Sequence, residues 1–198
     1  GVHIWYADKA TNVYILNPDM TGIPFPATGD NADLTRTIAH ATGNMVAVHV
    51  KENSKAYSTL TEAGSVYTNV ITHTELGACG VVPYSSEAFW TYDADSKTLT
   101  VLGSGAIRDY DSVDKAPWSD YDVETLVVQD GITRIGNNAF AALRNLKTVN
   151  VDGSVTDVAD TAFATENGKI VDSLNGTKFL TASDAMTAWL RKYGTSAL

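Results

Sequence analysis

The chain has 198 residues, of which 44% are hydrophobic and 19% charged, and its formal net charge is −9. This length suits one elongated domain or two small ones, and the composition is that of an ordered protein. The negative charge argues against nucleic acid and anionic lipid as partners, because both are recognised by basic surfaces. We expect no membrane insertion, since no apolar run reaches the roughly 18 residues of a spanning helix.

Residues 1–84 are predicted to form a β-rich N-terminal region. Residues 2–6 and 12–16 read as two strands joined by a turn, residues 31–41 as a short helix, and residues 45–50 as a further strand. Two alternatives remain open for this region. It is either a set of degenerate repeats or a separate small β-rich domain.

Residues 89–102 predict a β-hairpin, with residues 93–97 as its loop. The acidic residues of that loop superficially suggest calcium binding. The loop lacks the glycine and the later glutamate of a calcium-binding loop, so a simple turn is favoured.

The richest polar patch runs from residue 109 to residue 124, where acidic and aromatic residues alternate. Tyr110 and Tyr121 are its candidate binding residues, because such a patch can hold a basic partner, a cation or a sugar. The competing interpretation is a solvated loop in which Trp118 packs into the core.

An internal repeat occupies the next part of the chain. Residues 126–140 return as residues 149–163, with Leu126 matching Val149 and the pair Ala139 and Phe140 matching Ala162 and Phe163, all at one constant period. A fixed period of this size marks stacked coils, in which each unit buries its apolar face on its neighbour. We therefore expect Phe140 and Phe163 to be buried one above the other.

This repeat resembles the BspA-like class of leucine-rich repeats, which occurs on bacterial surface and secreted proteins. The matching residues are Ile132 to Phe140 with Leu146, and Val155 to Phe163. Ala159 stands where that family prefers glycine, and Leu143 where a cysteine is common. The resemblance implies a leucine-rich-repeat solenoid, β-rich with short helical or irregular convex segments, over residues 85–198. It also suggests that residues 52–58 and 64–67 form an inserted hairpin.

The C-terminus is predicted to close the solenoid. Residues 181–193 show the apolar spacing of an amphipathic helix, which would serve as a cap over the last open edge. One repeat period beyond Val149 lies Asp172, a poor inward residue, so we expect the array to end near there.

The sequence contains no recognisable catalytic, metal-binding or cofactor-binding motif. The four histidines, at positions 3, 40, 49 and 73, do not have metal-ligand spacing, and we interpret them as scattered. Cys79, the single cysteine, excludes an internal disulfide and is expected to be buried and inert. We therefore predict no catalytic residue, no metal site and no cofactor, and we do not expect an enzyme.

The predicted function is a non-catalytic secreted or cell-surface binding module of a bacterium, which adheres to a host or neighbouring-cell protein or glycan. No signal-peptide pattern is visible in the first residues of the sequence, so we expect a mature or trimmed form. The alternative is a structural spacer or an accessory domain of a larger surface protein. The sequence leaves the oligomeric state open. The candidate binding surface consists of the residues that alternate outward on the two best coils: Thr125, Val127, Gln129, Thr148, Asn150 and Asp152.

Overall fold

The computed structural model describes residues 5–8, 12–19, 47–62, 69–81, 87–152, 154–163, 173–174 and 177–178. Backbone contacts divide the chain into two compact units, Gly1–Leu76 (unit 1) and Gly77–Leu198 (unit 2). The sequence-based division after residue 84 stays a prediction. The helices predicted at residues 31–41 and 181–193 lie outside the described residues.

Unit 1 contains a four-stranded sheet. Strand β1 (Trp5–Asp8) pairs antiparallel with β2 (Asn12–Ile15), which confirms the predicted hairpin. Strands β2, β3 (Ala47–Lys51) and β4 (Val70–His73) run parallel to one another in that order. Strand β3 corresponds to the strand predicted at residues 45–50.

A short helix, α2 (Lys55–Thr61), connects β3 to β4, so the expected hairpin insertion at residues 52–58 is wrong. Ser54 starts this helix, because its hydroxyl oxygen accepts a hydrogen bond from the backbone N–H of Tyr57 at 3.0 Å. Ala56 and Leu60 are one helical turn apart, so they lie on one side of the helix, and both are fully buried in a cluster with Val48 and Val50. This burial decides the local structure in favour of a helix.

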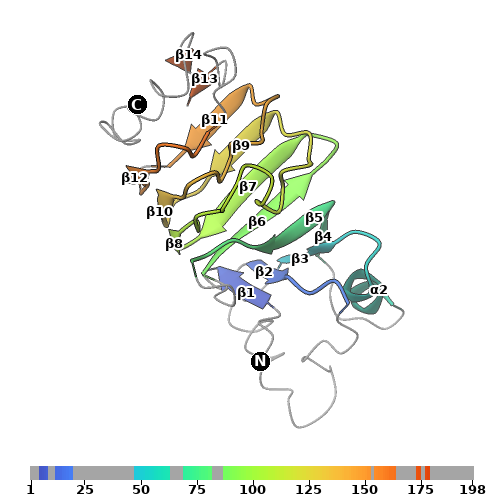
Figure 1. Ribbon diagram of the computed structural model, residues 1–198. Helices are drawn as coiled ribbons and strands as arrows, with labels where there is room; N and C mark the ends of the chain where they lie inside the picture. Colours follow the sequence, from blue (N-terminus) through green and yellow to red (C-terminus); the bar gives the residue numbers. More distant parts are fainter. Residues whose placement is uncertain are drawn as a thin grey trace. The chain divides into compact units, whose positions relative to one another are not determined.

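Unit 2 is built on two sheets that share one core. The longer sheet begins with β5 (Glu75–Ala78), which contains the boundary between the units, and the hairpin of β6 (Ala88–Asp93) and β7 (Thr98–Gly103). It continues with β9 (Thr125–Val128), β11 (Thr148–Val151), β13 (Ser173–Leu174) and β14 (Thr177–Lys178) (Figure 1). The smaller, parallel sheet consists of β8 (Gly105–Ala106), β10 (Ile132–Ile135) and β12 (Asp157–Val158). The predicted hairpin at residues 89–102 is thus confirmed.

The strands of successive coils pair in register. Leu126 pairs with Val149, its equivalent in the next copy of the repeat, as the sequence predicts. Leu99 pairs with Leu126, and these two residues are farther apart in the sequence than Leu126 and Val149. Val149 pairs with Leu174, and the sequence separation of this pair lies between the other two. The sheet therefore includes β13, which begins directly after Asp172, the position near which we expected the array to end.

The core of unit 2 confirms the repeat register. Phe140 and Phe163 form a parallel bridge, their ring centroids are 5.6 Å apart, and both side chains are buried. Ile135 and Val158 pair in the same way and are fully buried. Unit 2 is therefore a leucine-rich-repeat solenoid, as predicted.

The chain returns from each short strand to the next long strand through an irregular segment. We name residues 107–124 and 136–147 the return segments. Trp118 is completely buried in the first of them, where its indole packs on Phe140 at a centroid distance of 5.6 Å. The core-anchor interpretation of Trp118 is confirmed.

Candidate binding surface

Six of the predicted binding residues lie on one side of the long sheet. The side chains of β7, β9 and β11 that point away from the core form what we call the outer face. Parallel register aligns them in rows, with Thr98, Thr125 and Thr148 in one row and Thr100, Val127 and Asn150 in the next. Gln129 and Asp152 follow directly after β9 and β11, and their backbone N–H groups continue the hydrogen-bond ladder. Neighbouring side chains in a row are separated by the strand spacing of roughly 4.8 Å.

The outer face is buried at β6 and the end of β7 but exposed at β9 and β11. On β6 and β7, Phe89, Thr91 and Leu102 occupy outer positions but are at most 4% exposed, and neither Phe89 nor Leu102 belongs to the core cluster of unit 2. By contrast, Gln129, directly after β9, and Asn150 on β11 are exposed. In the described part of the chain, a partner therefore has access to the outer face at β9 and β11.

Charged side chains line the edge of this face where the long strands begin. The Lys97 ammonium lies 2.8 Å from the Asp122 carboxylate and 2.9 Å from that of Glu124, and Lys147 lies 2.6 Å from Glu124. Hydrogen bonds from Lys97 and Lys147 respectively hold the pKa values of Asp122 and Glu124 below their usual range. This edge is a ladder of paired charges, so it presents little net charge to a partner.

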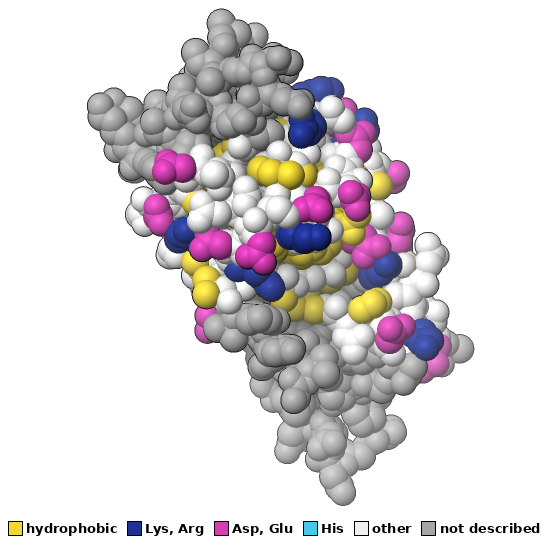
Figure 2. Space-filling model, in the orientation of Figure 1, with side chains coloured by type: hydrophobic (Ala, Val, Ile, Leu, Met, Phe, Trp, Pro, Cys, Tyr) yellow, Lys and Arg dark blue, Asp and Glu magenta, His cyan; other side chains and the backbone are white. Residues whose placement is uncertain are grey.

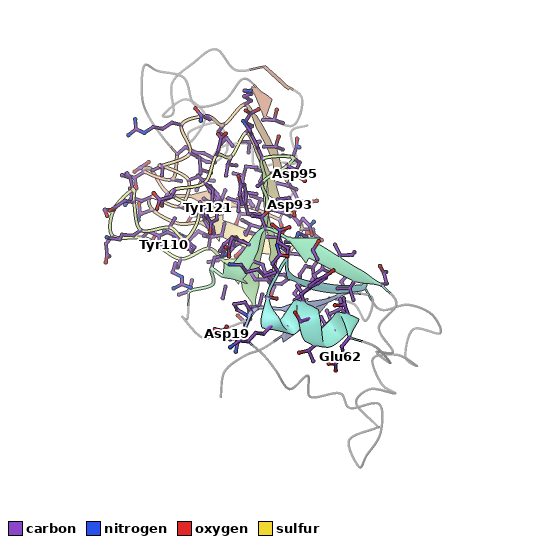
Figure 3. All side chains as sticks on the ribbon, turned by 90° about the vertical axis from the view of Figure 1, so that its right-hand side faces the viewer. Asp19, Glu62, Asp93, Asp95, Tyr110 and Tyr121 are labelled. Atoms are coloured by element: carbon purple, nitrogen blue, oxygen red, sulfur yellow. The ribbon has the colours of Figure 1, made fainter. Side chains whose placement is uncertain are left out.

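The two predicted tyrosines lie on the other side of the sheet, apart from the outer face. Tyr110 is buried, at 8% exposure, and its ring meets Trp118 edge-on at 6.0 Å. Tyr121 is partly buried and stacks on Tyr92 at 4.6 Å. Figure 3 shows both tyrosines on the side of the return segments. They pack against the core because a return segment must cover the inward face of the strands, and they do not extend the outer face.

Part of the acidic patch in the return segments serves the fold. One oxygen of Asp109 accepts hydrogen bonds from the backbone and side-chain amides of Asn137 and from the guanidinium of Arg134. The backbone bond, foremost, holds the pKa of Asp109 below its ordinary value. Arg134 also pairs with Asp157 at 2.9 Å, so one guanidinium links three successive coils. In the view of Figure 2, acidic and basic side chains alternate around smaller apolar areas.

The sequence interpretation missed one polar cluster, in unit 1. His49 and His73, which we interpreted as scattered, lie with Nδ1 of His49 2.8 Å from Nε2 of His73. The contact follows from the register of the parallel strands β3 and β4, because His49 pairs with Ile71 and His73 is the next residue on the same face of β4. Within the described ranges, no group of three or more His, Cys, Asp or Glu side chains could hold a metal ion.

Cys79 agrees with its prediction as a buried residue. Its side chain is fully buried, and burial raises the pKa of its thiol to about 12. A thiol held neutral in this way is neither a nucleophile nor a metal ligand near pH 7.

The comparisons with known proteins place few constraints on this chain. No protein-family model matches it, and no curated protein does. Among solved structures, a leucine-rich repeat protein from Eubacterium ventriosum is similar at 29% identity and a TM-score of 0.40, over 50% of this chain. The chain spans 25% of the length of that protein. In the described part of the chain, no helix is long and apolar enough to cross a membrane.

Proposed function

We propose that unit 2 is a non-catalytic binding module that recognises a protein or a glycan through the outer face of β9 and β11. The observation that carries this proposal is the accessible set of hydroxyl, amide and carboxylate groups on two adjacent coils. Gln129, Asn150 and Asp152 are exposed there, and the residues that alternate with them are buried in the core. A rigid backbone thus presents rows of hydrogen-bonding groups at fixed spacing, a recurring arrangement in repeat proteins that bind macromolecules.

The setting that we propose is the bacterial surface or the secreted fraction, with a host or neighbouring-cell macromolecule as the partner. The support is the sequence resemblance to BspA-like repeats, together with the paired edge charges, which favour hydrogen-bonded recognition over attraction of a strongly charged polymer. In the alternative, unit 2 is a spacer or accessory domain, and its outer face has no ligand.

The test compares two triple variants of the full chain on arrays of extracellular-matrix proteins, cell-surface proteins and glycans. One variant replaces Gln129, Asn150 and Asp152 by alanine. The control replaces three acidic residues of the first return segment, Asp111, Asp114 and Asp120, by asparagine. We expect the first variant to lose binding and the control to retain it. No binding by the parent protein favours the spacer, whereas loss in the control alone moves the site to the return segments.

A further inference from the structure

The second face of the sheet in unit 1 carries a ladder of stacked rings. Tyr14, His49 and His73 come from the adjacent strands β2, β3 and β4 and point away from the cluster that α2 covers. The Tyr14 and His49 rings are 4.2 Å apart with planes 14° from parallel, and the His49 and His73 rings are 5.1 Å apart at 13°. His49, in the middle, is only 8% exposed.

Hydrogen bonds determine which imidazole nitrogens of His49 and His73 carry a hydrogen. Nε2 of His49 lies 2.9 Å from the amide oxygen of Asn12, which can only accept, so this nitrogen carries a hydrogen. In neutral His49 the other nitrogen, Nδ1, is then an acceptor. The proton in the 2.8 Å contact between the rings therefore belongs to Nε2 of His73.

This arrangement accepts one added proton but not two. A proton on Nδ1 of His73 leaves its Nε2–H directed at His49 and converts the contact into a stronger, charge-assisted hydrogen bond. A second proton has to bind Nδ1 of His49, which removes the acceptor and sets two N–H groups and two positive charges against each other. Two further charged side chains on this face, Lys51 and Glu75, pair with each other at 2.5 Å.

We propose that His49 and His73 act as an acid-sensitive switch, which keeps the ladder closed with one added proton and opens this face of unit 1 when a second proton binds. The pKa of His49 is lowered to about 4, first by burial and then by His73. Because an unfolded histidine protonates near 6.5, the open form binds this proton at higher pH than the closed form. Stability of the closed form is therefore complete above about pH 6.5 and falls as the pH decreases toward 4.

The linkage predicts the size of the effect. A pKa difference from 6.5 to about 4 shifts the equilibrium between closed and open forms on the order of 100-fold between pH 7 and pH 4. The amides of β3 and β4 should lose protection against hydrogen exchange by this factor, after correction for the intrinsic rate. The amides of β9 and β11 should not.

The experiment uses the full chain and two readouts. NMR of the imidazole C–H groups should give a pKa of about 4 for His49, and hydrogen exchange should show the acid opening of β3 and β4. His49→Gln should abolish the acid opening. His73→Gln, whose side-chain amide can still donate to Nδ1 of His49, removes the neighbouring positive charge and should weaken the acid opening without abolishing it.

Two results would overturn the switch. One is a His49 resonance that titrates at the ordinary pKa of a histidine in the parent protein, and the other is a His49→Gln variant that opens in acid as the parent does. If either glutamine variant fails to fold, the titration of the parent protein decides alone.

Discussion

The indole nitrogen of Trp118 donates a hydrogen bond of 2.7 Å to the backbone carbonyl of Ala139. The bond joins the first return segment to the second inside the core, where neither group meets water. Trp118→Phe keeps an aromatic ring against Phe140 but leaves this carbonyl without its donor. We expect a loss of about 1–3 kcal/mol in the free energy of unfolding, measured by denaturant titration. Trp118→Leu should cost more, because it removes ring packing as well.

The stacked pair Phe140 and Phe163 gives a direct test of the repeat register. Truncation of Phe140 to alanine should cost about 3–5 kcal/mol, the range for a fully buried aromatic side chain. Val127→Ala is the matched control on the outer face, where the side chain is only partly buried, and should cost well under half as much. Equal unfolding midpoints for Phe140→Ala and the parent protein would contradict the stacked core.

Alanine substitutions at two glycines distinguish the cost of backbone strain from the cost of a steric clash. Gly131 has φ +101° and a Cβ placed on it would lie 2.2 Å from the carbonyl oxygen of Gly103, whereas Gly105 has φ +86° with nothing within 4 Å. Gly105→Ala should therefore cost only the strain of a left-handed alanine, roughly 1–2 kcal/mol. Gly131→Ala should cost more, since the coil before it has to move. Thermal unfolding of both variants checks this, and an equal loss in the two would show that the contact relaxes freely.

Cys79 should react with thiol reagents only after unit 2 opens. Its side chain is fully buried and the pKa of its thiol is raised to about 12, so the thiolate is scarce in mildly alkaline buffer. We expect labelling of the native protein to be slower than labelling in denaturant by a factor that follows the unfolding equilibrium. Reaction in native buffer at the denatured rate would place Cys79 in contact with solvent.

The core of unit 2 was predictable because its information is periodic. Equal spacing identifies Phe140 with Phe163 and Ile135 with Val158, and stacked coils bring equivalent positions together. The wider spacing between Leu99 and Leu126 was missed, because the first return segment is longer and has no second copy to reveal it.

The structural features that the sequence did not predict are those that do not repeat along the chain. Alternation identifies Thr91 and Phe89 as outer residues, but it does not show that both are buried. The position of Tyr110 in a return segment depends on which way an irregular backbone turns. The capping serine and the apolar pair Ala56 and Leu60 were a readable helix signal, which the resemblance to an inserted hairpin overrode.

The coils of unit 2 have unequal lengths, which shows that the register of the strands is constrained and the length of the return segments is not. The stretch of chain between paired residues differs from one coil to the next, while inward side chains keep the strands in register. We therefore expect insertions and deletions to be tolerated in the return segments but not in the strands. A duplicate of residues 126–148, spliced in at residue 149, should add one complete coil and widen the sheet by one strand spacing of roughly 4.8 Å. The protein therefore has a modular length that evolution, or an engineer, can change without redesign of the core.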